Sequence, residues 1–203
     1  MLKEKMNLKL VIFDLDGTVV ENYYDWPSIR KELGVEAGSI LAYLDGLPEP
    51  QRSEKYALLE EHERRQTEKA VLKPGIAPFL KWLKATGLAT ALVTNNNLTN
   101  TQLLLDRFHL SFDLILTRES GLHKPTAAPF LKVMDDLGVR PEETAVIGDT
   151  HYDLLAAREA GVKLVFILKS STTPGDLEGA ALVESFEQIR EKLIKLSEKD
   201  PSP

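Results

Sequence analysis

Short apolar runs alternate with helical patterns from residue 74 onward, and this alternation constrains the fold more than any other feature of the chain. An earlier run of the same kind, KLVIFDL at residues 9–15, is typical of a buried strand. The other strand-like runs cover residues 88–94, 112–117, 143–148, 163–168 and 181–183. Strands that alternate with helices indicate a parallel sheet covered on both faces, so we predict an α/β fold with a three-layer, Rossmann-like core.

The segments between these runs carry apolar residues at helical spacing. Gly87, Gly138 and Gly161 follow three of them, and a glycine just past the last turn is a common helix stop signal. We expect helices over residues 78–85, 99–108, 127–137 and 152–160, and an amphipathic C-terminal helix over 186–199.

Residues 20–72 interrupt this rhythm, because they contain no strand-like run. Asp25 and Pro27 indicate the start of a helix and Gly34 its end. Two more helices are expected, a short one over 39–44 and a long, highly charged one over 53–70 with a thin apolar stripe. We therefore predict a small α-helical cap formed by residues 20–72. The cap is inserted into a core formed by residues 1–19 and 73–203.

The composition excludes several kinds of site and partner. The 203 residues include no cysteine, which excludes disulfides and thiolate metal sites. The net charge is −6 and no basic run occurs, so we expect no nucleic-acid partner. No apolar stretch reaches the ~20 residues of a membrane span, and the first ten residues are too polar for a secretory signal. We therefore expect a cytoplasmic protein with no membrane partner.

Polar residues gather at the predicted carboxyl ends of the strands, where an open parallel sheet binds its ligands. Several carboxylates with no cysteine suit Mg²⁺, while a hydroxyl, an amide and a lysine suit a phosphoryl group. The set therefore predicts a magnesium-dependent phosphoryl-transfer site. Its members are Asp14 and Asp16 after the first strand, Thr94 and Asn95 after the second, Lys124 after the third, and Asp149 and Asp153 after the fourth.

The same residues carry a resemblance to the haloacid dehalogenase-like (HAD) phosphohydrolase superfamily. DLDGT at 14–18 resembles the family pattern DxDGT, and GDTHYD at 148–153 resembles GDxxxD. LVTNN at 92–96 and HKP at 123–125 resemble the threonine and lysine motifs. The following LLAAREAGV is similar to the phosphoglycolate phosphatase-like branch. Four motifs in order, each at a strand end, are more specific than any one of them.

The resemblance implies a role for each matched aspartate. Asp14 would be the nucleophile and would form an aspartyl-phosphate. Asp16 would be the general acid and base, protonating the leaving alcohol and then accepting a proton from water. Mg²⁺ would be bound by Asp14, by the backbone carbonyl of Asp16 and by Asp149. An aspartate at position 16 favours phosphate esters over the carbon–halogen and phosphonate substrates of other members.

The remaining motif residues would hold the phosphoryl group. The resemblance implies that Thr94 and the backbone amide of Asn95 bind phosphoryl oxygens. Lys124 would neutralise the nucleophile and the transferring group. Asp153 would orient Lys124 or a metal-bound water.

Four residues shortly after the first motif could line the entrance to the site: Tyr23, Tyr24, Trp26 and Arg30. They form a candidate substrate gate. Aromatic clusters of this kind more often pack a cap onto its core, so both interpretations stay open.

Four further polar residues close to the motifs receive structural interpretations. We interpret Asn96 and Asn97 as turn and capping residues. His123 and His151 are expected to be loop histidines that face solvent.

The leading functional hypothesis is a phosphatase that acts on a small phosphorylated metabolite, with phosphoglycolate or a sugar phosphate as candidates. A phosphomutase of the β-phosphoglucomutase type is the alternative, since it shares every catalytic motif. The small cap favours hydrolysis, because a mutase must keep water from its intermediate. A non-catalytic phospho-aspartate signalling module is a remote third hypothesis. Such modules lack a cap and an aspartate at the position of Asp16.

Overall fold

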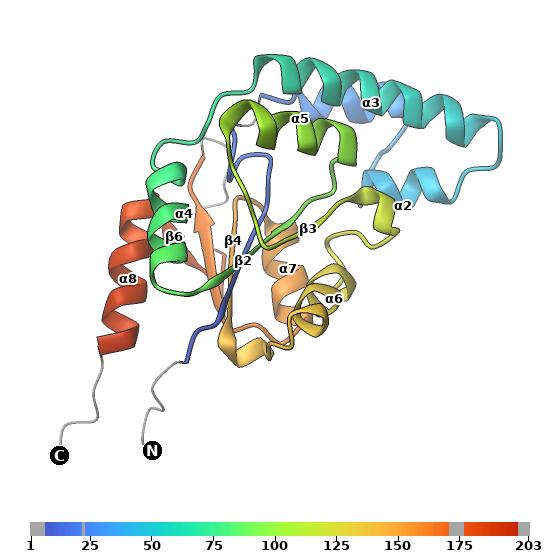
Figure 1. The fold of residues 1–203 in the computed structure, drawn as a ribbon. Helices are drawn as coiled ribbons and strands as arrows, with labels where there is room; N and C mark the ends of the chain where they lie inside the picture. The colour runs from blue at the N-terminus through green and yellow to red at the C-terminus, as the bar shows by residue number, and fades with distance from the viewer. Residues whose placement is uncertain (1–6, 22, 171–176, 199–203) are drawn as a thin grey trace.

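The computed structural model describes residues 7–21, 23–170 and 177–198. Six parallel strands form one sheet in the order β3-β2-β1-β4-β5-β6 (Figure 1). Each predicted run contains one strand, so the parallel Rossmann-like sheet is confirmed. The strands are β1 (Leu10–Phe13), β2 (Ala89–Val93), β3 (Leu114–Leu116), β4 (Thr144–Gly148), β5 (Leu164–Leu168) and β6 (Ala181–Val183).

Helices cover both faces of the sheet. Val11 and Phe13 of β1 belong to a core cluster with residues of α4 (Ile76–Ala85), α5 (Leu98–Phe108) and α8 (Phe186–Glu198). Leu10 and Ile12 belong to a second cluster with residues of α6 (Ala128–Asp136) and α7 (His151–Glu159). Successive side chains of a strand point to opposite faces, which is why β1 is buried along its whole length.

The helix boundaries lie close to the predicted ones. α4 begins two residues earlier than expected, at Ile76, and therefore contains Pro78 in its first turn. A proline is tolerated there because the first backbone N–H groups of a helix have no partner within it. Short 3₁₀ turns at Arg118–Ser120 and Pro141–Glu143 complete the regular structure after β3 and before β4.

Three helices lie between β1 and α4, and we call them the three-helix unit: α1 (Trp26–Leu33), α2 (Ile40–Asp45) and α3 (Gln51–Lys69). As predicted, Asp25 caps α1, accepting a hydrogen bond from the Ser28 backbone N–H at 3.2 Å, and Gly34 ends the helix. The unit has an apolar cluster of its own, made of Ile29, Leu33, Val35, Leu41, Leu44 and Leu59.

The chain enters and leaves this region along two neighbouring segments. Val20 forms an antiparallel bridge with Leu72, and the backbone N–H of Glu21 donates to the carbonyl of Val71 at 2.9 Å. The two ends of the three-helix unit therefore lie side by side.

The long helix α3 contacts the rest of the protein mainly through polar side chains. Its buried residues are Leu59, Glu63, Gln66 and Thr67. Gln66 accepts a hydrogen bond from the backbone N–H of Tyr23 at 3.2 Å and donates to the Glu21 carbonyl at 2.8 Å. This differs from the expected thin apolar stripe, since hydrogen bonds replace apolar contact along much of the buried face.

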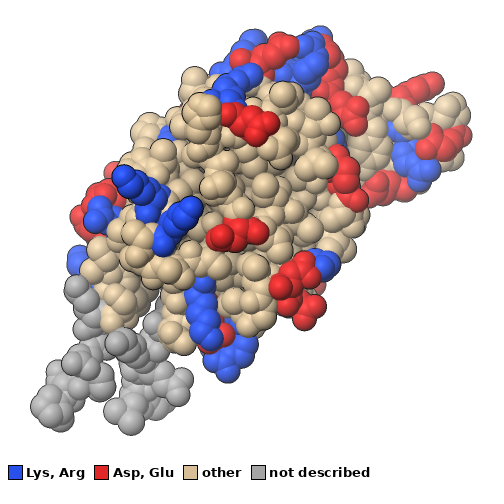
Figure 2. Space-filling model, viewed as in Figure 1, with Lys and Arg blue, Asp and Glu red and all other residues tan. Residues whose placement is uncertain are grey.

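The outer face of α3 carries charges of both signs. Charged side chains of both signs gather along the upper edge of the molecule in Figure 2, where Figure 1 shows α3. Glu61 pairs there with Arg64 and Arg65, at 2.9 and 2.8 Å. None of the helices in the described ranges has the length and apolar composition that a bilayer span requires.

Candidate active site

A pocket of about 280 Å³ lies at the carboxyl ends of the central strands β1, β2 and β4 and is bordered on its other side by residues of the three-helix unit. This is the place where the strand order reverses direction along the chain, which is the usual ligand site of such sheets. The structure brings together in this pocket six of the predicted residues: Asp14, Asp16, Thr94, Asn95, Lys124 and Asp149.

Lys124 lies between two carboxylates. Its Nζ is 2.5 Å from Asp14 Oδ1 and 2.7 Å from Asp153 Oδ1, and its side chain is only 4% exposed. Burial acts to lower the pKa of Lys124, but the two carboxylates outweigh it and raise that pKa above its ordinary value. The lysine is therefore held as an ammonium group beside Asp14.

Asp153 uses both of its carboxylate oxygens. Oδ1 binds Lys124, and Oδ2 accepts hydrogen bonds from the backbone N–H of Thr150 at 3.1 Å and from its hydroxyl at 2.8 Å. Thr150 and Asp153 form a capping box at the start of α7. Asp153 does not line the pocket, and it both caps α7 and accepts a hydrogen bond from Lys124.

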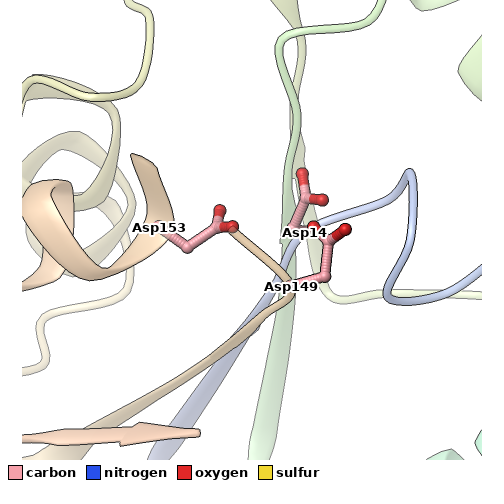
Figure 3. Close-up of side chains that lie close together, drawn as sticks. All are labelled: Asp14, Asp149 and Asp153. Carbon is pink, nitrogen blue, oxygen red and sulfur yellow. The ribbon is translucent and has the colours of Figure 1, made fainter. Parts of the chain in front are cut away.

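Three aspartates form a buried carboxylate cluster. One oxygen atom from each of Asp14, Asp149 and Asp153 lies within 4.8 Å of the others. Figure 3 shows the Asp14 and Asp149 carboxylates side by side, with Asp153 reaching toward them from α7. Among the described residues, no hydrogen-bond partner exists for the buried Oδ1 of Asp149. Asp153 already binds Lys124 and Thr150 through its two oxygens, whereas Oδ1 of Asp149 and Oδ1 of Asp16 have no partner among the described residues. Carboxylate oxygens therefore remain for a cation.

Acidic side chains outnumber basic ones among the residues that line the pocket. Burial raises the pKa of Asp14 to about 6, although Lys124 opposes this. Burial and the nearby Asp14 raise the pKa of Asp16 to about 7, and the same two causes raise that of Asp149 well above its ordinary value. These raised pKa values reflect carboxyl groups crowded together in a buried site, and a divalent cation would stabilise their charged forms.

The side chain of Asp16 is held by Asn96. Asp16 Oδ2 accepts a hydrogen bond from Asn96 Nδ2 at 3.0 Å, and the hydroxyl of Tyr24 lies 3.4 Å from the same nitrogen. Asn96 is buried and lines the pocket. The interpretation of Asn96 as only a turn residue is therefore incomplete, whereas Asn97 is the N-cap of α5 as predicted.

The loop after β2 presents a hydroxyl to the pocket. Thr94 is buried, and its Oγ1 accepts a hydrogen bond from the backbone N–H of Asn96 at 3.0 Å. The hydroxyl hydrogen therefore remains available to a bound anion. The side chain of Asn95 accepts from the Lys124 backbone N–H and donates to its carbonyl, both at 3.0 Å. This pair fixes the loop of Lys124 against β2.

Sequence reasoning missed a buried ion pair at the edge of the pocket. Glu63 of α3 accepts two hydrogen bonds of 2.8 Å from Arg118 and one of 2.9 Å from Asn97 Nδ2. Glu63 also lines the pocket. The sequence does contain one indication that Glu63 is buried. Its helical spacing from Leu59 places both residues on the same buried face of α3.

The candidate gate is only partly in place. Tyr24, Trp26 and Arg30 line the pocket, but Tyr23 does not. Tyr23 is 58% exposed, so it does not belong to the candidate gate. The physical reason is that its neighbour Tyr24 turns inward, where its ring stacks on that of Trp26 at 4.4 Å between centroids.

The two histidines next to the motifs differ from each other. His151 is exposed as expected, although it begins α7 and lines the pocket. The expectation that His123 faces solvent is wrong: its side chain is only 16% exposed, and its Nε2 lies 3.4 Å from Asp45 of α2. The packing of α2 against the loop of Lys124 covers this ring.

Comparison with known proteins gives consistent matches. A family model described as haloacid dehalogenase-like hydrolase matches residues 8–161. The chain is 30% identical over 200 residues to an uncharacterized hydrolase of Saccharomyces cerevisiae, across 95% of this chain and 89% of that protein. It is 31% identical over 183 residues to a phosphoglycolate phosphatase of Aquifex aeolicus, across 79% of this chain and 85% of the relative.

A solved structure has the same fold. The crystal structure of CbbY from Rhodobacter sphaeroides in complex with phosphate matches with a TM-score of 0.70 and 24% identity. The match covers 90% of this chain and 96% of that chain.

Proposed function

Because this chain belongs to the haloacid dehalogenase-like hydrolase family, we propose that it hydrolyses a small phosphate monoester through an aspartyl-phosphate on Asp14. Membership of this family and similarity to its phosphoglycolate phosphatase-like branch were predicted from the motifs and are confirmed. The chain is a phosphatase enzyme. The observation that best supports this mechanism is the position of Lys124. Its side chain is buried between Asp14 and Asp153, in a pocket that Asp16 also lines.

In the first step, an Asp14 carboxylate oxygen attacks phosphorus, and the bond from phosphorus to the alcohol oxygen breaks. Asp16 gives its proton to the departing oxygen. In the second step, the Asp16 carboxylate takes a proton from a water molecule that attacks the same phosphorus. The bond between phosphorus and the Asp14 oxygen breaks, so inorganic phosphate leaves and the Asp14 carboxylate is restored. The hydrogen bond from Asn96 supports this role, since it holds the Asp16 side chain at the pocket.

We propose that Thr94, Asn95 and Lys124 hold the phosphoryl oxygens. The Thr94 hydroxyl and the Asn95 backbone N–H would donate to two of them. The Lys124 ammonium would stabilise the charge that develops in the transition state. Asp153 fixes the position of that ammonium from the side away from the substrate.

Asp14, Asp149 and the backbone carbonyl of Asp16 would hold Mg²⁺. The unpartnered Asp149 oxygen and the excess of acidic over basic side chains around the pocket support this assignment. When bound, the ion supplies charge neutralisation for the phosphoryl group and the nucleophile.

We propose that residues 20–72 act as the cap of this site and that residues 1–19 and 73–203 form its core. The three-helix unit supports this division, because it has a separate apolar cluster and its two ends lie side by side. Trp26 at the pocket is 37% exposed and His151 is exposed too, so water reaches the site. This favours hydrolysis over the phosphomutase alternative.

Phosphate release tests the proposal. Metal-free protein is assayed with phosphoglycolate and with a sugar 1-phosphate, before and after addition of Mg²⁺. We expect inorganic phosphate to be released only when Mg²⁺ is present. Conversion of the sugar 1-phosphate into its 6-phosphate without net phosphate release would identify a mutase instead.

A further inference from the structure

We propose that the substrate's leaving group is a single small apolar or aromatic unit that carries no second phosphate. This inference rests on the function proposed above and narrows its substrate class. The half of the pocket that faces the strand ends would be filled by the phosphoryl group. The leaving group must then lie against the residues of the three-helix unit.

The half of the pocket formed by the three-helix unit is mostly apolar. Ile40 and Leu41 of α2 and Leu59 of α3 line it, together with the rings of Tyr24 and Trp26. Leu41 and Leu59 are buried within the unit's own apolar cluster, so their positions are fixed by packing. A leaving group with many hydroxyls would find few hydrogen-bond partners on this surface. The free-energy cost of removing those hydroxyls from water would therefore not be offset.

The aromatic pair provides a flat surface for a ring. The rings of Tyr24 and Trp26 stack with a centroid distance of 4.4 Å and an interplanar angle of 22°. Trp26 is 37% exposed, so part of its ring is open to contact by a ligand. Covering this surface with an apolar ring would remove two apolar faces from water, which is the main source of affinity in small pockets.

The charges in this half of the pocket disfavour a second phosphate. Among the described lining residues, Arg30 and Glu63 are the charged side chains outside the strand-end set. Arg30 already donates to the Gly38 carbonyl at 2.8 Å. Glu63 is fixed by its two hydrogen bonds from Arg118. A second phosphate, with a charge of about −1.5 to −2 at pH 7, would meet the single positive charge of Arg30, since the Glu63–Arg118 pair offers no net positive charge.

The volume of the pocket also limits the size of the leaving group. Its volume of about 280 Å³ is just below the range of about 300–1,000 Å³ that is usual for ligand pockets. The phosphoryl group would occupy part of this space and leave a smaller volume for the leaving group.

The test compares three esters that all release an alkoxide: benzyl phosphate, glycerol 3-phosphate and propane-1,3-diyl bisphosphate. With Mg²⁺ present, we expect kcat/KM for benzyl phosphate to exceed that of the other two by about tenfold or more, because its ring is buried on binding. We expect Trp26→Ala to reduce kcat/KM for benzyl phosphate by about tenfold more than for glycerol 3-phosphate.

Tyr43→Ala is the matched control, because Tyr43 is an exposed aromatic residue of α2 that does not line the pocket. It should leave the ratio between the esters unchanged. Equal or better turnover of glycerol 3-phosphate or the bisphosphate would overturn the inference while leaving the proposed function intact. An equal loss with all three esters in Trp26→Ala would overturn it too. Failure of the wild-type protein to hydrolyse any of them would contradict the proposed function itself.

Discussion

Gly17 lies directly against the carboxylate of Asp149: a Cβ atom at position 17 would come within 2.0 Å of Asp149 Oδ2. Gly17 also has a φ of 92°, in the region that favours glycine. The position of Asp149, in the fourth motif, therefore requires a glycine at position 17, in the first motif, although the two motifs are far apart in the sequence. Without it, Asp149 could not occupy the place from which it would bind Mg²⁺.

Gly17→Ala should weaken the metal site. The new methyl group would displace the Asp149 carboxylate, so we expect the Mg²⁺ concentration for half-maximal activity to rise by about tenfold to a hundredfold. Gly87→Ala is the control, because Gly87 has a φ of 76° but no atom within 4 Å of an added Cβ. A Mg²⁺ titration of phosphate release compares the two variants. An unchanged Mg²⁺ requirement in Gly17→Ala would contradict the role given to Asp149.

Glu63→Ala should destabilise the protein strongly. Removing this carboxylate leaves Arg118, whose side chain is 8% exposed, as a buried charge with its main partner gone. We expect the free energy of unfolding to fall by about 3–5 kcal/mol, and the double variant Glu63→Ala/Arg118→Ala to lose less than the sum of the single losses. Urea denaturation gives these values. Arg64→Ala, which breaks exposed ion pairs, should cost less than about 1 kcal/mol.

The raised pKa of Asp16 predicts the pH dependence of turnover. Burial and the Asp14 charge raise that pKa to about 7, so the proton needed by the leaving group is present below this value and lost above it. We expect kcat/KM for an alkyl phosphate to fall as the pH rises through about 7. For p-nitrophenyl phosphate the fall should be shallower, since nitrophenolate leaves without a proton. Identical pH profiles for the two esters would argue against Asp16 as the acid.

The parts of the site that follow from local sequence were predictable. Asp14, Thr94 and Asp149 come directly after runs whose composition identifies them as strands, and parallel strands end at the same edge of the sheet. The capping of α1 by Asp25 is equally local.

Features that depend on how the three-helix unit meets the core were not predictable. Glu63 looks like one more solvated charge of α3 until Arg118, from a turn after β3, is brought against it. Asn96 looks like a capping residue until β1 and β2 pair and place Asp16 within 3.0 Å of it. Choosing between Tyr23 and Tyr24 required the path of the chain into α1, which no short pattern specifies.

The central claim is that Asp14 is the nucleophile, and turnover of p-nitrophenyl phosphate by Asp14→Asn tests it most directly. Asp106→Asn, at an exposed position on α5, is the matched control, and circular dichroism reports whether both variants fold. We predict that Asp14→Asn folds and loses at least about a thousandfold in kcat, as removal of a nucleophile does, while Asp106→Asn keeps its activity. Wild-type turnover by a folded Asp14→Asn protein would contradict the account.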